Sequence, residues 1–177
     1  MNTRISIIHV TGALIIVPFL VSLALVATGK SVFLRIKSSS MHPNFCEGDI
    51  ALVKVRKSPR SSPALSVGQV IVFTGPKNNI LIKRIAGTPS DRIEYSSHSV
   101  LRNGQVPYTN QVCTEAREHV EPRGLVVPVR SVFAVGDNWN ESEDSRQFGS
   151  IPETSIIGKV VMRIPLNIGS CSCGSRR

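Results

Sequence analysis

Three separated segments carry side chains that could together activate a serine hydroxyl, and the first is the polar turn Ser38-Ser39-Ser40-Met41-His42-Pro43. Pro43 removes a backbone donor and restricts φ, so such a turn is constrained and can expose a hydroxyl. Serines are also ordinary turn residues, and this segment alone does not identify a nucleophile. His42, two residues after Ser40, is the alternative base within this segment.

The second segment is Ile80–Ile85, in which a lysine lies inside an apolar run. With a period of two, Lys83 shares one face of a strand with Leu81 and Ile85, whereas Arg84 points to the other face. A lysine is a base only when neutral, and its ordinary pKa is about 10.4. Burial on an apolar face lowers that pKa and predicts a general base. The alternative is an edge-strand lysine whose ammonium reaches solvent.

The third segment is the loop 136–149, which reads GDNWNESEDSRQFG after a short apolar run. It offers carboxylates, hydroxyls and a guanidinium within a few residues. One interpretation is a surface loop with an exposed Asp144–Arg146 ion pair, worth about 0–1 kcal/mol. The other is a loop that supports a catalytic lysine, in which the Ser142 hydroxyl accepts a hydrogen bond from the ammonium.

The elements that must position these segments are short apolar or alternating runs separated by turn residues, which is typical of β structure. Turns are indicated by Asn103-Gly104, Gly75-Pro76 and Gly87-Thr88-Pro89. We expect a mainly β fold, an antiparallel sheet or partly closed β-barrel, with flexible stretches at Lys57–Gly68 and Thr109–Pro128. The expected strands are Val32–Ile36, Ile50–Val55, Val70–Phe73, Ile80–Ile85, Arg92–Tyr95, Ser99–Arg102, Val132–Val135 and Ile157–Ile164.

The run Ile5–Ala27 contains no Asp, Glu, Lys or Arg. As a helix it covers roughly 34 Å, enough to cross a hydrocarbon core of about 30 Å. It predicts one retained transmembrane helix rather than a cleaved secretory signal, because the run is long and ends without a clear Ala-x-Ala site. Arg4 precedes it and Lys30, Arg35 and Lys37 follow it, so charge counting alone favours a cytoplasmic C-terminal domain.

Composition limits the remaining possibilities. The chain has 177 residues, a formal net charge of +9 and 41% hydrophobic residues, which suits one globular domain with a basic surface. The basic residues are scattered and the dense stretch Arg56–Arg60 has few aromatic neighbours, so lipid headgroups are favoured over nucleic acid. No cysteine pair has C-x2-C spacing, which argues against a metal site. Cys46, Cys113, Cys171 and Cys173 could form disulfides in an oxidising compartment, with three connectivities that the sequence does not rank, and free thiols are the default expectation.

Taken together, the motifs resemble the type I signal peptidase family of membrane-bound serine proteases. The resemblance rests on Ser40-Met41 with Pro43, Gly48-Asp49, Gly68–Phe73, Lys83-Arg84 with Gly87, and the string G-D-N-x3-S-x-D-S-R-x2-G at 136–149. It implies that Ser40 is the nucleophile and Lys83 the general base, with the Ser38 hydroxyl and the Ser40 N–H forming the oxyanion hole. It also implies that Ser142 orients the lysine and that Asp144 and Arg146 give structural support.

The resemblance further implies cleavage of N-terminal signal peptides from exported preproteins after small residues, through an acyl-enzyme and without metal or cofactor. The lysine base indicates the bacterial or organelle branch. The expected location is the bacterial cytoplasmic membrane, with an organelle inner membrane as the less favoured alternative. The family's catalytic domain lies on the extracytoplasmic side, and this expectation overrules the charge count. The corresponding division is 1–4 flank, 5–27 anchor, 28–37 juxtamembrane segment, 38–165 peptidase domain and 166–177 tail.

Two residues depart from the family pattern, Glu141 and Gln69, where an uncharged residue and an aspartate are common. Two other classes remain open at this point. One is a self-cleaving Ser/Lys repressor protease, against which the apolar N-terminal run and the 136–149 string argue. The other is an inactive anchored module that binds exported chains.

Overall fold

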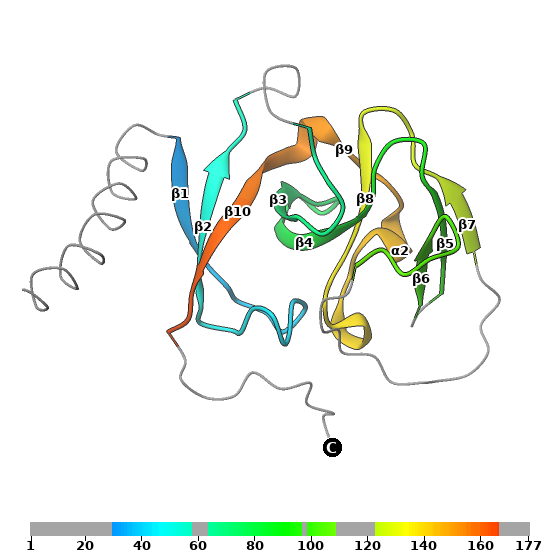
Figure 1. Cartoon of the computed structure of the whole chain (residues 1–177). Helices are drawn as coiled ribbons and strands as arrows, with labels where there is room; N and C mark the ends of the chain where they lie inside the picture. Colours follow the sequence, from blue (N-terminus) through cyan, green and yellow to red (C-terminus); the bar gives the residue numbers. More distant parts are fainter. Residues whose placement is uncertain (1–29, 58–63, 97–98, 109–122, 167–177) are drawn as a thin grey trace, which may run out of the picture.

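The fold is known from a computed structural model that describes residues 30–57, 64–96, 99–108 and 123–166 (Figure 1). The predicted anchor Ile5–Ala27 lies outside these residues. Within the described ranges, no helix has the length and apolarity needed to cross a membrane.

Seven antiparallel strands form the main sheet, in the order β1-β2-β10-β3-β4-β8-β9 (Figure 1). The register shifts in β10 between Ile156 and Gly158 and again between Val160 and Met162, and in β4 between Ile85 and Gly87. Irregularities of this kind bend a strand and increase its twist, which curls the sheet. The strands are β1 (Ser31–Arg35), β2 (Ile50–Val55), β3 (Val70–Thr74), β4 (Ile80–Gly87), β8 (Ser131–Val135), β9 (Ile151–Pro152) and β10 (Ile156–Ile164).

A smaller sheet of three strands, in the order β6-β5-β7, lies beside the main sheet (Figure 1). Its strands are β5 (Arg92–Tyr95), β6 (Val100–Arg102) and β7 (Arg123–Val126). The prediction of a wholly flexible stretch at Thr109–Pro128 is therefore wrong at its C-terminal end. The run Arg-Gly-Leu-Val is short and contains a glycine, so its strand character comes from pairing with β5 rather than from local preference.

The eight predicted strands are all present, with ends shifted by at most two residues. The mainly β, antiparallel prediction is confirmed for the described residues. β9 was missed because it has only two residues and one is Pro152. The helices among the described residues are single turns: α2 (Ser145–Phe148) and the 3-10 helices η1 (Trp139–Glu141) and η2 (Glu153–Ser155).

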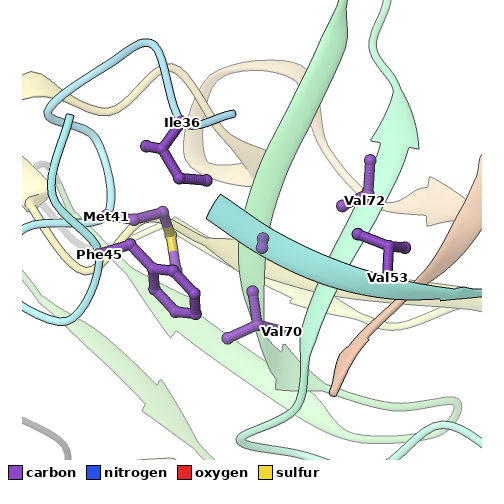
Figure 2. Close-up of a cluster of buried hydrophobic side chains, with 7 residues drawn as sticks. Ile36, Met41, Phe45, Val53, Val70 and Val72 are labelled. Atoms are coloured by element: carbon purple, nitrogen blue, oxygen red, sulfur yellow. The ribbon is translucent and has the colours of Figure 1, made fainter. Parts of the chain in front are cut away.

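Three apolar clusters fill the space around the sheets. The first joins the β1–β2 connection to strands β2 and β3, and Figure 2 shows Met41 and Phe45 of that connection facing Val70. The second lies between β3, β4, β8 and β10, and the third joins β8 to the smaller sheet. The first cluster matters most for the site, because it holds the turn that carries Ser40.

Cys46 is buried and disulfide-bonded, and its partner lies outside the described residues. The default expectation of a free thiol is therefore wrong for this residue. A structural disulfide is typical of proteins that mature in an oxidising compartment.

Candidate active site

Ser40 lies in the long connection between β1 and β2. The His42 N–H donates to the Ser39 carbonyl at 2.9 Å and the Phe45 N–H donates to the Met41 carbonyl at 2.9 Å, which closes two consecutive turns. Met41 and Phe45 are buried in the first apolar cluster. The burial of Met41 and Phe45 thus anchors the turn to the apolar cluster immediately after Ser40, and this fixes the position of the serine.

A buried carboxylate closes the base of the same connection. Asp49 accepts hydrogen bonds from the Cys46 N–H at 2.8 Å and from Arg163 Nε at 2.6 Å. The Ile36 N–H donates to the Asp49 carbonyl at 2.8 Å, at the point where the two strands begin to pair. These contacts attach the serine turn to β1 and β10 at both of its ends.

Lys83 lies in β4, which is paired with β3 on one side and with β8 on the other. Its residue partner on β3 is Ile71, and only 2% of Lys83 is exposed. β8 pairs with β4 only from Arg84 onward, but a lysine with that burial does not extend its ammonium into solvent, so the alternative of a solvent-reaching edge-strand lysine does not apply.

The Lys83 and Ser40 side chains meet although they are 43 residues apart. Lys83 Nζ donates a hydrogen bond to Ser40 Oγ at 2.7 Å. The Ser38 hydroxyl lies 3.2 Å from Ser40 Oγ, within hydrogen-bonding distance. His42 is not part of this arrangement, since its Nε2 is buried without a hydrogen-bond partner among the described residues.

Burial lowers the pKa of Lys83 from 10.5 to about 8, because the charged amine loses its hydration. The Asp144 carboxylate opposes this effect and the Arg146 guanidinium reinforces it. The neighbouring residue Arg84 has a carboxylate partner of its own. It forms two hydrogen bonds with Asp137, at 2.8 Å from Nε and 2.6 Å from Nη2. Two adjacent basic residues therefore have different chemistry, and the lysine is the one that can give up a proton near neutral pH.

Asp144 organises the loop 136–149. Its carboxylate accepts hydrogen bonds from the Gly136 N–H at 2.9 Å, from Ser142 Oγ at 2.6 Å, and from Arg146 Nε and Nη2 at 2.9 Å each. Asp144 is also the N-cap of α2, where it forms a capping box with Gln147. The Asp144–Arg146 pair is buried, with side-chain exposures of 0% and 2%, so it is not the exposed pair of the surface-loop interpretation.

Ser142 lies close to the turn that carries Ser40 but forms no hydrogen bond with Lys83 among the described residues. Its hydroxyl donates to Asp144, and the direct hydrogen bond expected between Ser142 and Lys83 is not formed among the described residues. Gly136 is in contact with Ser142 and with the Ser40 carbonyl, because an added Cβ there would overlap both. The loop thus lies directly against the serine turn.

Two residues at the start of this loop hold the serine turn, and sequence reasoning gave neither a role. Asp137, besides pairing with Arg84, accepts a hydrogen bond from Asn44 Nδ2 at 2.9 Å. The Asn138 N–H donates to the Ser40 carbonyl at 3.0 Å, and its Nδ2 donates to the Ser39 carbonyl at 3.2 Å. The signal that could have found them is the Gly-Asp-Asn start of the loop string.

A groove with a cavity volume of about 650 Å³ opens at the serine and the lysine. One wall is the end of β1 with the residues that follow it, and the other is the first half of β4. Glu141 and Glu143 also line it; Glu141 accepts a hydrogen bond from the Ser39 hydroxyl, and Glu143 pairs with Lys77. The lining consists of Phe33, Leu34, Arg35, Ile36, Lys37, Ser38, Ser40, Val72, Ile80, Leu81, Ile82, Lys83, Glu141 and Glu143.

Comparison with known proteins gives a consistent result. A family model described as signal peptidase, peptidase S26, matches residues 7–165. Signal peptidase IB of Staphylococcus aureus (strain Mu50) is 31% identical over 144 residues, which is 72% of this chain and 74% of that protein. Signal peptidase I V of Bacillus subtilis is 32% identical over 138 residues, which is 71% of this chain and 81% of that protein.

Among solved structures, a signal peptidase I from Enterococcus faecalis V583 matches with a TM-score of 0.48 and 24% identity. The match covers 57% of this chain and 100% of that one. The family model covers most of the chain, and the two curated relatives exceed 30% identity over more than two thirds of it. The chain therefore belongs to the S26 family of signal peptidases.

Proposed function

We propose that this protein is a serine endopeptidase that removes N-terminal signal peptides from exported preproteins, with Ser40 as nucleophile and Lys83 as general base. The observation that carries the proposal is the 2.7 Å contact between a buried amine and a buried hydroxyl. With a pKa of about 8, roughly one lysine in ten is neutral at pH 7, against a few in ten thousand for an ordinary lysine.

In the first step, neutral Lys83 takes the proton of Ser40 Oγ while that oxygen attacks the scissile carbonyl. The carbonyl oxygen becomes an oxyanion, and in this proposal the Ser38 hydroxyl and the Ser40 N–H stabilise it. Each such donor is worth about 2.7–4 kcal/mol in enzymes of this kind. The 3.2 Å separation of the Ser38 and Ser40 hydroxyl oxygens supports this role for Ser38.

In the second step, the Lys83 ammonium protonates the leaving amine as the C–N bond breaks, which leaves the acyl group esterified to Ser40. Neutral Lys83 then takes a proton from water, whose oxygen attacks the ester carbonyl. The same ammonium returns the proton to Ser40 Oγ as the acid product leaves. The protons balance within one cycle, since one side chain carries each of them.

The loop residues keep the lysine in its low-pKa state. Arg146 compensates the charge of Asp144, so the carboxylate does not restore the ordinary pKa of Lys83. The Ser142 hydroxyl is tied to the same carboxylate and lies beside Gly136, against the Ser40 carbonyl. In this proposal Ser142 orients the lysine through packing and through Asp144.

Substrate binding is proposed at the first half of β4. β8 pairs with β4 only from Arg84 onward, so Ile80–Lys83 have no strand partner on that edge within the described part of the chain. An extended peptide can add there as a strand, with its backbone hydrogen-bonded and alternate side chains in the groove. The preference for small side chains before the cut is taken from the family resemblance.

The segment 5–27 is proposed as a membrane anchor, with the domain 38–165 on the extracytoplasmic side. Disulfide bonding of Cys46 supports an oxidising location for that domain. Labelling engineered cysteines at positions 2 and 57 with a membrane-impermeant reagent in intact cells tests this topology. Exclusive labelling of the N-terminal site would contradict it.

The cleavage experiment uses the full chain in detergent with a preprotein substrate. Wild type and a variant of an exposed lysine, Lys57→Ala, are expected to release the mature protein, whereas Ser40→Ala and Lys83→Ala are expected to lose activity by at least about a thousandfold. Equal cleavage by all four proteins would show that Ser40 and Lys83 do not form a catalytic dyad. Cleavage of its own chain alone would favour the repressor-type protease, and no cleavage by wild type would favour the inactive module.

A further inference from the structure

The peptide unit between Ser39 and Ser40 is held from outside its own turn. Its carbonyl accepts one hydrogen bond from the His42 N–H within the turn, at 2.9 Å, and a second from Asn138 Nδ2 at 3.2 Å. Asn138 is 5% exposed, and its own N–H donates to the carbonyl of the next peptide unit, at Ser40. One residue therefore contacts two consecutive carbonyls of the nucleophile turn.

The contact with Ser39 has a consequence for Ser40. A trans peptide is planar, and its N–H points in the opposite direction to its C=O. A donor that holds the Ser39 carbonyl therefore also fixes the direction of the Ser40 N–H, which belongs to the same plane. That N–H is one of the two donors assigned above to the oxyanion hole.

The backbone on both sides of Asn138 is also held in place. Gly136 packs against the Ser40 carbonyl, and the Glu141 N–H donates to the Asn138 carbonyl at 3.2 Å in the first turn of η1. The Glu141 carboxylate accepts a hydrogen bond from the Ser39 hydroxyl, so the same loop also holds the Ser39 side chain. The side chain of Asn138 is itself buried and bonded to the Ser39 carbonyl, so it is not a mobile surface amide.

We propose that Asn138 is a positioning residue of the oxyanion hole, which aims the Ser40 N–H by holding the Ser39 carbonyl. The inference rests on the proposed peptidase function. It assigns Asn138 an effect on the transition state, in which the oxyanion is present, and none on substrate binding or on the pKa of Lys83.

The test compares wild type, Asn138→Ala, Asn138→Asp and the control Asn140→Asp in the full chain. Asn138→Ala removes the side-chain donor and retains the backbone bond to Ser40, while Asn138→Asp keeps the shape and replaces the donor by a carboxylate. Asn140 is exposed and two residues away in the same 3-10 helix. The readouts are kcat, KM and the inhibition constant of a peptide aldehyde, whose adduct with a serine places an oxygen in the oxyanion hole.

We expect Asn138→Ala and Asn138→Asp to lower kcat by about tenfold to a hundredfold, less than the hundredfold to thousandfold of deleting a donor outright. KM is expected to change less than about threefold, and aldehyde affinity to fall by the same factor as kcat/KM. In Asn138→Ala the acidic limb of the pH profile should stay where it is in wild type. Asn140→Asp should match wild type in all readouts.

An unchanged kcat in both variants, or a lowered kcat with unchanged aldehyde affinity, would overturn the proposal. So would a shifted acidic limb in Asn138→Ala, because Asn138 would then act through Lys83. Circular dichroism identifies a variant that does not fold, and the other variant then carries the test. If wild type does not cleave the preprotein, the proposed function fails; if wild type cleaves and the variants match it, only this inference fails.

Discussion

Gly136 lies directly against the carbonyl oxygen of Ser40, with no room for a side chain between them. A Cβ atom at this position would overlap that oxygen and the Ser142 hydroxyl, and the oxygen belongs to the backbone, which cannot rotate away. The loop 136–149 and the turn that carries Ser40 are thus in contact through their main chains. We expect the position of Ser40 relative to Lys83 to depend on this contact.

Replacing Gly136 by alanine is therefore expected to push the two segments apart. Overpacking of this kind costs about 1–3 kcal/mol of folding free energy. Displacing a reacting group by about 1 Å can cost a hundredfold in rate, so if Ser40 is the nucleophile, as proposed, kcat should fall by about a hundredfold even where the variant stays folded. Gly124→Ala is the control, since the nearest atom to an added Cβ there lies 3.7 Å away, an ordinary contact. Wild-type kcat in Gly136→Ala would show that the contact is dispensable.

The burial of Lys83 should reduce stability at neutral pH. Its pKa is about 8 in the folded protein and 10.5 in the unfolded chain, so the unfolded chain binds more protons between these values and stability rises with pH across that window. Below pH 8 the penalty is complete, at up to about 3 kcal/mol.

Lys83→Met is expected to be inactive and, at pH 7, more stable than wild type by about 1–3 kcal/mol, after the lost hydrogen bond to Ser40 is deducted. The difference should shrink between pH 8 and 10.5. Urea unfolding at several pH values measures it. A less stable Lys83→Met at pH 7 would mean that burial of the amine carries no such cost.

Arg146 is expected to set the position of the pH profile. Its guanidinium lowers the pKa of Lys83 by compensating Asp144, so Arg146→Gln should raise that pKa and move the acidic limb of kcat/KM to higher pH. Arg146→Lys retains the charge and should shift the limb less. A shift of Arg146→Gln toward lower pH would contradict the charge-compensation account.

Asp137 should contribute strongly to folding stability. It accepts both ion-pair hydrogen bonds of Arg84 and one from Asn44, at 0% exposure. Removing one partner of a buried ion pair costs about 3–5 kcal/mol. Asp137→Asn should lower the free energy of unfolding by that amount, measured in urea, while the exposed-pair control Glu94→Gln changes it by less than about 1 kcal/mol.

Much of the fold was predictable because the strands with apolar runs are also the ones that pair in the main sheet. Lys83 could be placed on an apolar strand face from the period of two alone. β7 and β9 could not be predicted, since their pairing partners lie elsewhere in the chain and their own residues include a glycine and a proline.

The site was predictable in its residue types and less so in its contacts. The motif string located Ser142, Asp144 and Arg146, but no spacing rule shows that the Ser142 hydroxyl donates to Asp144 instead of meeting the lysine. The link from Asn138 to Ser39 spans 99 residues and depends on how two loops meet. Such contacts follow from tertiary packing, which one sequence does not display.

The most direct test of the account is the pH dependence of kcat/KM for cleavage of a short peptide substrate. In the proposed mechanism neutral Lys83 is the active form, so activity should rise tenfold per pH unit at low pH and level off above a pKa of about 8. Ser40→Ala should show no activity at any pH. A plateau reached above a pKa of about 6.5, typical of a histidine base, or a profile without an acidic limb would contradict the central role of Lys83.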